Sequence, residues 1–211
     1  MDRQPYAQAS IEAYLGKLAS ADPEPGGGSV AALVGALGAG LVTMVCDLTL
    51  GKEKFAAVQE SVAGIRSQAE TLRAELTKLI TADADAYAQV AAAMKLPRDT
   101  EEQKSERARL LQAALKGAAA VPLRVAEAAG EVARLTLPAA EQGNPNAVSD
   151  AGVAVLLADA AAQSAALNVK INLGWIEDKD FNEDAWTRVQ AVLSAAAGLR
   201  EQVMALTYSK L

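Results

Sequence analysis

The sequence predicts an all-α protein, a single-domain, up-and-down-like helical bundle with long helices, and two observations support this prediction. Apolar residues make up 51% of the 211 residues and alanine dominates them, whereas aromatic residues contribute only 4%. Alanine is the best helix former, while a β-sandwich would need β-branched and aromatic strands. Apolar residues also recur at steps of three and four over long segments, which is the period of one helix face. The length suits one domain over residues 1–211.

Three helices are expected in the first half of the chain. A short amphipathic helix covers 11–18, and a second helix begins with Ser29 near its N-cap and stops at Gly51. Small residues recur in the second helix at four-residue spacing, so another helix can approach it closely and a homodimer is expected. From 55 to 94 one apolar stripe predicts a third helix of about 60 Å. Asp83 is the only charged member of that stripe.

The second half of the chain continues the bundle. Asp99 and Glu102 resemble a capping box at the start of a helix. Pro122 should kink this helix, because proline removes a backbone donor. The later boundaries are a loop over 138–145, a helix from about 147 to 173, and a last helix from about Asp184.

Charge and composition exclude several kinds of partner. The net charge is −6 and no basic arm is visible, so nucleic acid is not an expected partner. The polar segment 1–10 excludes an ordinary secretory signal, and the apolar run 30–46 falls short of the ~20 residues that span a bilayer. Cys46 cannot form an internal disulfide and is expected to be a buried thiol in a reducing compartment. We therefore expect a cytoplasmic protein without a membrane partner.

The chain contains no histidine. This excludes Ser-His-Asp and Cys-His catalysis and ordinary zinc sites. Acid–base chemistry must then use Asp, Glu, Lys, Tyr or the ligand itself.

Two segments suggest anion binding. Gly27, Gly28 and Ser29 lie where a loop enters a helix, and exposed backbone N–H groups at a helix N-terminus favour a phosphate or carboxylate. The segment lacks the Gly-Lys-Ser/Thr ending of a nucleotide-binding loop, and a flexible helix cap is the alternative. Lys52 and Lys54 flank the end of the same helix and could hold an anionic ligand. Alternatively, the positive charges of these lysines interact with the negative end of the helix dipole.

Asp83 is the candidate for proton transfer. A carboxylate on an apolar stripe is desolvated, and burial raises its pKa toward the range useful for acid–base catalysis. The alternative is a buried aspartate that pairs with a lysine or caps another helix.

A fourth cluster combines Asn146, Ser149 and Asp150, at the start of an apolar helix, with Asn168 near its end. Asn168 lies five turns beyond Asp150, so both face the same side but are ~27 Å apart. Across a two-fold axis an antiparallel partner helix would bring the two ends together, which predicts an intersubunit site. Helix capping is the alternative role for Asn146 and Ser149.

Three segments together resemble the cyclodeaminase/cyclohydrolase family of folate enzymes. They are PGGGSVAALVGALGAGLVTMVCDLTLGKEKF (25–55), the DxxAY from Asp83 to Tyr87, and GNPNAVSDAGVAVLLADAAAQSAALNVKIN (143–172). The resemblance covers nearly the whole chain in the same order. It implies an all-helical dimer that binds a reduced folate, polyglutamylated or not, in a cleft involving the subunit interface. One departure is Asp47, where many relatives are expected to carry asparagine.

The resemblance also implies roles for residues of the three segments. Asp83 is expected to be the general acid/base, Asp150 to orient it or to balance a cationic ligand, and Lys52 to hold a folate carboxylate or assist proton transfer. The substrate-binding candidates, which include Lys54 and Asn146 from the clusters above, are Gly27, Gly28, Ser29, Lys54, Asn146, Ser149 and Asn168.

Two reactions remain open. A cyclohydrolase would hydrolyse 5,10-methenyltetrahydrofolate to 10-formyltetrahydrofolate, and a cyclodeaminase would form the methenyl compound from 5-formiminotetrahydrofolate with release of ammonia. Both pass through a tetrahedral carbon between two nitrogens, and neither needs a metal or redox cofactor. The alternatives are a non-enzymatic helical binding or interaction protein and an enzyme acting on another cyclic amidine.

Overall fold

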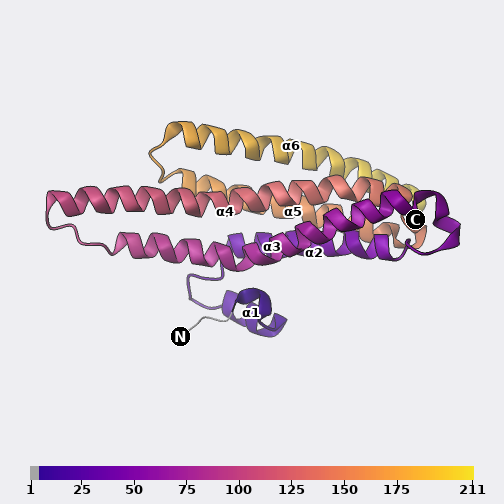
Figure 1. The fold of residues 1–211 in the computed structure, drawn as a ribbon, viewed down its shortest axis with the longest axis horizontal. Helices are drawn as coiled ribbons and strands as arrows, with labels where there is room; N and C mark the ends of the chain where they lie inside the picture. Colours follow the sequence, from indigo (N-terminus) through magenta and orange to yellow (C-terminus); the bar gives the residue numbers. More distant parts are fainter. Residues whose placement is uncertain (1–4) are drawn as a thin grey trace.

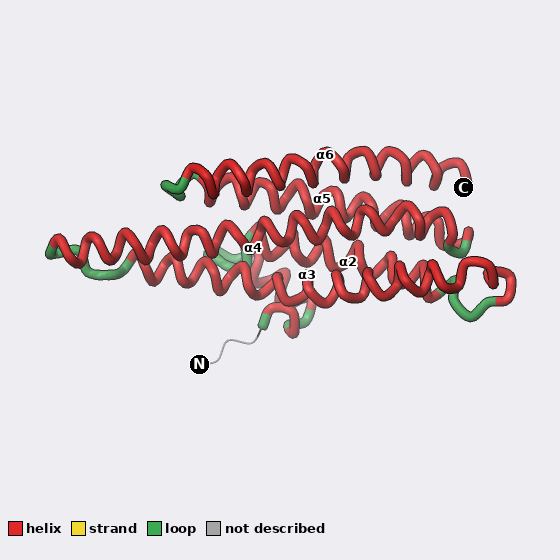
Figure 2. Tube along the Cα trace, turned by 45° about the horizontal axis from the view of Figure 1, so that its top comes forward, coloured by secondary structure: helices red, strands yellow, loops and turns green. Residues whose placement is uncertain are grey.

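The structure, a computed structural model, describes residues 5–211, and all regular structure in that range is helical (Figures 1 and 2). The elements are η1 (Tyr6–Gln8), α1 (Ile11–Leu18), α2 (Gly27–Asp47), η2 (Glu53–Val58), α3 (Gln59–Met94), α4 (Glu101–Gln142), η3 (Pro145–Ala147), α5 (Val148–Leu173) and α6 (Lys179–Lys210). The prediction of an all-α fold with long helices is confirmed. Figure 1 shows the long helices side by side, with α1 set apart beside α2 and α3.

The core is built largely from alanine and valine on α2, α4 and α5. α2 and α5 run antiparallel, since Gly27 lies beside Asn168 while Gly38 lies beside Ala154. A Cβ added at Gly38 would come within 3.2 Å of the Ala154 carbonyl oxygen. The small residues noted in the sequence thus let these two helix backbones approach closely within one chain.

Three boundaries in the first half differ from the sequence prediction. Gly26 is the N-cap of α2, and Ser29 is the third residue of that helix rather than its cap. α2 ends at Asp47, and Gly51 follows in a turn with a φ of 72°. The α3 helix begins after η2 rather than at Phe55, whose φ of −115° interrupts helical geometry.

Three boundaries in the second half also differ. Thr100 and Gln103, not Asp99 and Glu102, form the capping box, with Oγ1 of Thr100 accepting the Gln103 N–H at 3.2 Å. α4 continues through Pro122 and Pro138 to Gln142, so the predicted loop over 138–145 is reduced to its last residues before η3. The last helix begins at Lys179, capped by Asp178, five residues before the predicted start. Leu123 and Ala139, which directly follow the two prolines, are buried in the core, and this burial outweighs the helix-breaking tendency of proline.

Within residues 5–211, two segments, Gly27–Asp47 and Pro145–Leu173, are long and apolar enough to cross a membrane. The expectation that the first falls short considered only 30–46, whereas the helix itself has 21 residues. In each segment 56% of the most apolar window is buried inside the protein, as in a core helix. Cys46 is buried as predicted, and desolvation raises the pKa of its thiol to about 11.

Candidate active site at the start of α2

Asp83 on α3 reaches the first turn of α2. Its Oδ2 accepts a hydrogen bond from the backbone N–H of Ser29 at 3.1 Å. A Cβ at Gly28 would lie 2.1 Å from Oδ1 of Asp83, so only glycine leaves room for the carboxyl. The first N–H groups of a helix have no partner within the helix, and the helix dipole favours a negative charge there. Asp83 therefore caps α2. Capping another helix was one of the alternative roles that the sequence suggested for this residue.

The same carboxyl also faces a cavity of about 420 Å³. The cavity lies between the loop before α2 and helices α3, α4 and α5. Its polar lining comes from Glu24, Asp83, Asn168 and Asn172. The rest of its lining is mainly apolar or aromatic and includes Tyr87, Val90, Met94, Leu115, Ala118, Ile171 and Trp175. A cavity of this size with few polar groups is typical of a small-molecule site.

The pKa of Asp83 is raised above its ordinary value. Desolvation by burial is the largest cause, the Ser29 N–H acts in the opposite direction, and the charge of Glu24 adds to the rise. A raised pKa brings the carboxyl closer to the range in which it both accepts and donates a proton.

Asn168 joins this site from α5, whereas the sequence grouped it with Asn146, Ser149 and Asp150. A Cβ at Gly27 would lie 3.3 Å from Nδ2 of Asn168, which donates a hydrogen bond to the Ser164 carbonyl at 2.9 Å. Nδ2 of Asn172 donates to the carbonyl oxygens of Ala118 (3.2 Å) and Asn168 (2.9 Å). These bonds fix two amide side chains in the cavity wall.

The remaining predicted residues lie at the other end of α2. Thr49 Oγ1 accepts the backbone N–H of Asn144 at 2.8 Å, which ties the end of α2 to the start of α5. Lys52 and Lys54 in the loop after α2, and Asn146, Ser149 and Asp150 at the start of α5, belong to this end. Lys52, Lys54, Asn146 and Ser149 are exposed, and Asp150 is half-buried.

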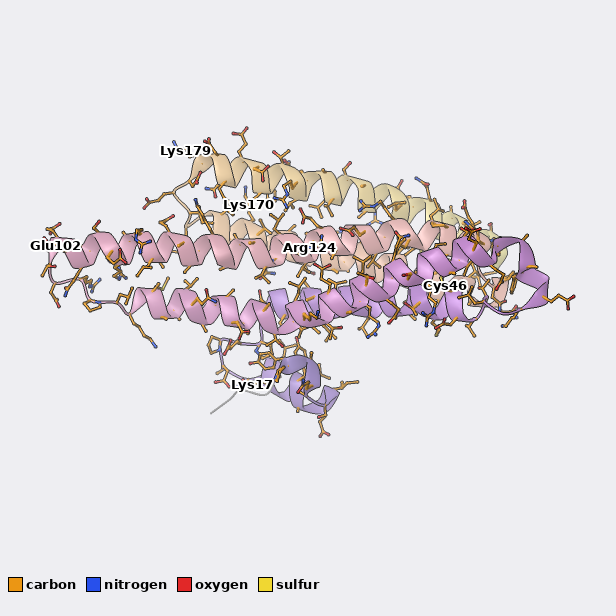
Figure 3. All side chains as sticks on the ribbon, in the orientation of Figure 1. Lys17, Cys46, Glu102, Arg124, Lys170 and Lys179 are labelled. Atoms are coloured by element: carbon orange, nitrogen blue, oxygen red, sulfur yellow. The ribbon has the colours of Figure 1, made fainter. Side chains whose placement is uncertain are left out.

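The predicted residues therefore form two groups within one chain. The first, the cavity group, consists of Gly27, Gly28, Ser29, Asp83 and Asn168. The second, the distal group, consists of Lys52, Lys54, Asn146, Ser149 and Asp150. Figure 3 marks the two ends, with Cys46 at the distal end and Lys170, two residues after Asn168, toward the cavity. Asp150 and Asn168 both lie on α5, which is continuous between them, and eighteen residues of helix span ~27 Å.

Neither Asn146 nor Ser149 caps a helix. Asn144 does so, because its Oδ1 accepts the Asn146 N–H at 3.2 Å at the start of η3. Asp47 forms an ion pair with Arg66 on the surface, with 2.5 Å between Oδ1 of Asp47 and Nε of Arg66. The negative charge of Asp47 is therefore neutralised within the chain. Lys170 lies over the ring of Trp186 at 4.3 Å and not in the cavity.

Several residues of the site were not identified from the sequence. Glu24 and Trp175 line the cavity, and the Tyr14 hydroxyl lies 3.0 Å from Oγ of Ser29. Glu24 had a usable signal, since it directly precedes the PGGGS segment. Tyr14 had none, because its spacing in the amphipathic helix is that of an ordinary core residue.

Comparison with known proteins identifies the family of the chain. The family model described as formiminotransferase-cyclodeaminase matches residues 10–191. The chain is 43% identical over 201 residues to the methenyltetrahydrofolate cyclohydrolase of Methylorubrum extorquens, covering 95% of this chain and 97% of that protein. It is 35% identical to the formimidoyltransferase-cyclodeaminase of Rattus norvegicus over 92% of this chain, which is 36% of that longer protein.

A solved structure has the same fold. The crystal structure of formiminotetrahydrofolate cyclodeaminase from Thermotoga maritima matches with a TM-score of 0.86 and 30% identity, covering 96% of this chain and 97% of that one. Because the family match and the full-length relatives agree with the three segments noted in the sequence, the chain belongs to the formiminotransferase-cyclodeaminase family.

Proposed function

We propose that this chain is a folate one-carbon enzyme that hydrolyses 5,10-methenyltetrahydrofolate to 10-formyltetrahydrofolate. The observation that carries the proposal is the Asp83 carboxyl, held by the Ser29 N–H at the wall of an otherwise largely apolar cavity. The 43% identity to the Methylorubrum cyclohydrolase over nearly the full length of both chains supports this reaction over the related one.

The chemistry requires one group that takes and returns a proton. Asp83 as carboxylate accepts a proton from water while the water oxygen bonds to the methenyl carbon, giving a tetrahedral carbon between N5 and N10. The protonated carboxyl then donates its proton to N5 as the N5–carbon bond breaks. The hydroxyl on the same carbon releases its proton to water and becomes the carbonyl of the formyl group, which stays on N10. Because its pKa is raised, the Asp83 carboxylate is a better proton acceptor in the first step than an ordinary aspartate.

The cavity walls suit the remainder of the substrate. Tyr87, Met94 and Trp175 offer apolar and aromatic surface to the flat pteridine and aminobenzoyl rings. The amides of Asn168 and Asn172 offer hydrogen-bonding groups toward the pteridine edge. The carboxylates of Asp83 and Glu24 lie where the positive charge of the methenyl group would be stabilised.

We propose further that a homodimer completes the site. The outer faces of α2 and α5 carry large apolar side chains in contact with solvent, namely Leu37, Met44, Leu48, Val153, Leu156, Leu167 and Ile171. Such a patch is typical of a protein interface. A two-fold axis perpendicular to these antiparallel helices would place the distal group of one protomer beside the cavity group of the other.

This arrangement gives the distal group a role. Lys52 and Lys54 would meet the carboxylates of the folate glutamate tail, with one or several glutamates. Asp150 would orient Asp83 or balance the cationic reaction centre, and Asn146 and Ser149 would offer hydrogen bonds. Sedimentation of the protein as a fully active monomer would exclude the arrangement.

The proposal extends to cofactors and cell compartment. The reaction needs only water and a proton shuttle, so we expect full activity after exhaustive chelation, without added metal or redox cofactor. The buried Cys46 thiol suits the reducing cytoplasm. The negative net charge argues against nucleic acid as a partner, and the burial of α2 argues against the membrane.

An absorbance assay with 5,10-methenyltetrahydrofolate tests the proposed reaction. Enzyme-dependent loss of the methenyl chromophore without ammonia identifies a cyclohydrolase. The second candidate is a cyclodeaminase, favoured by the likeness to the Thermotoga structure. It would instead produce the chromophore from 5-formiminotetrahydrofolate together with ammonia. If neither signal moves and reduced folates do not bind, the non-enzymatic alternative stands.

A further inference from the structure

The N-terminal segment, residues 6–18, consists of η1 and α1 and contacts the site through one buried side chain. Tyr14 is the buried residue of α1 and is 6% exposed. Its ring packs edge-on against Tyr6, with centroids 6.1 Å apart. Its hydroxyl lies 3.0 Å from Oγ of the fully buried Ser29. An apolar groove of about 620 Å³ lies between this segment and helices α2 and α3, and η1 also packs against α3. Tyr14 is the side chain of the segment that contacts Ser29 in the first turn of α2.

Ser29 connects two contacts. Its hydroxyl meets Tyr14, and its backbone N–H donates to Oδ2 of Asp83 at 3.1 Å. That N–H belongs to the first turn of α2 and has no acceptor within the helix, so outside partners determine where it points. A displacement of the Ser29 hydroxyl therefore displaces the donor that holds Asp83.

We infer that Tyr14 is a positioning residue for Asp83, acting by holding Ser29 so that the Ser29 N–H stays directed at the carboxyl. The inference rests on the proposed function for the claim that Asp83 transfers the proton. The contact itself exists whatever the substrate is. Tyr14 does not line the cavity that holds Asp83, so its influence on the reaction passes through Ser29.

The charged groups around Asp83 make the effect measurable. Glu24 faces the carboxyl from the loop before α2, Tyr14 lies near it from α1, and Tyr87 lines the same cavity from α3. The cavity residues from α4 and α5 are uncharged. Burial raises the pKa of Tyr14, so its phenol is neutral at neutral pH and replacing it by phenylalanine changes no charge. A change in the titration of Asp83 would then report the altered geometry at Ser29.

The test compares Tyr14→Phe, Ser29→Ala and the double variant. Carboxyl carbon NMR follows the titration of Asp83 in the absence of substrate, with Asp83→Asn to assign the signal. We expect each single variant to raise the pKa of Asp83, because the N–H that lowers it is less well directed. We also expect kcat to fall about threefold to tenfold, the scale of one weakened hydrogen bond, with KM nearly unchanged. The double variant should be no worse than the more affected single variant, since both remove the same contact.

Tyr208→Phe on α6 is the matched control, because Tyr208 is 72% exposed and distant in sequence from the site residues. It should change neither the titration nor kcat. The inference is overturned if Tyr14→Phe leaves the Asp83 titration unchanged, or if the effects of the two single variants simply add. If Tyr14→Phe fails to fold, Ser29→Ala removes the same contact from the other side and decides alone. Because the titration needs no substrate, a protein inactive toward both folates would refute the proposed function and still test Tyr14.

Discussion

Gly28→Ala is the substitution that most directly tests the candidate site. The added Cβ would lie 2.1 Å from Oδ1, 2.5 Å from Cγ and 2.8 Å from Oδ2 of Asp83. Ordinary contact begins at 3.4 Å. The whole carboxyl must therefore move by about 1 Å or more, on the scale at which misplacement of a catalytic group costs about 10²-fold in rate.

The backbone of α2 accepts the substitution without strain. Gly28 has no positive φ, and alanine favours the helix by about 0.5–1 kcal/mol relative to glycine. The loss of the hydrogen bond between Ser29 and Asp83 offsets this gain by about 0.5–1.5 kcal/mol. We therefore expect a folded protein of nearly unchanged stability whose kcat is about 10²-fold lower.

The assay is decay of the methenyl chromophore at saturating substrate, with thermal unfolding followed by circular dichroism. Gly64→Ala is the matched control, because it adds the same methyl group to α3 where nothing lies within 4 Å, and it should keep full activity. Gly27→Ala should be intermediate, since its Cβ would meet only the Asn168 amide at 3.3 Å. A Gly28→Ala enzyme within threefold of wild type would refute the claim that the Asp83 carboxyl must occupy this place.

Three further predictions use the same assay. Asp83→Asn should lower turnover by roughly 10²–10⁴, the usual contribution of acid–base catalysis, and wild-type turnover would remove Asp83 from the mechanism. Glu24→Gln removes a negative charge that raises the pKa of Asp83, so that pKa should fall. The acidic limb of the pH profile of kcat should then move to lower pH, and a shift to higher pH would contradict this. Asp83→Asn and Asp150→Asn subunits, refolded together, should regain about a quarter of wild-type activity, because half the dimers carry one intact intersubunit site. No recovery would count against that site.

The sequence was sufficient for the fold and insufficient for the exact element ends. Long stripes at helical spacing predicted the helices, because burial of one face determines most of a helix. The boundaries depend on local competition. At Thr100 and Gln103 two capping patterns overlap within one residue, and the side chains that bond the backbone decide between them. At Pro138, burial in the bundle carries α4 past a residue that a local pattern treats as a stop.

The sequence indicated candidate residues for the site but not which of them lie together in the folded chain. The stripe through Asp83 continues to Tyr87 and Met94, yet both are half exposed, and the helix buries Ala84 and Ala93 instead. Over 36 residues the face of α3 that meets the core turns gradually, so the later stripe members line the cavity. Which residues from other helices lie opposite them depends on packing that spacing along one helix does not encode.

The glycine-rich start of α2 shows how the prediction from sequence differs from the arrangement in the structure. From the sequence it predicts a place for a ligand anion, because a helix N-terminus attracts negative charge. In the structure the Ser29 N–H there holds the carboxylate of Asp83. Since the methenyl group of the proposed substrate is a cation, a carboxylate stabilised by a helix and turned toward the cavity suits the reaction better than an anion pocket would. In the proposed dimer the anionic glutamate tail would be bound by the lysines of the distal group, so binding and chemistry would depend on opposite ends of α2.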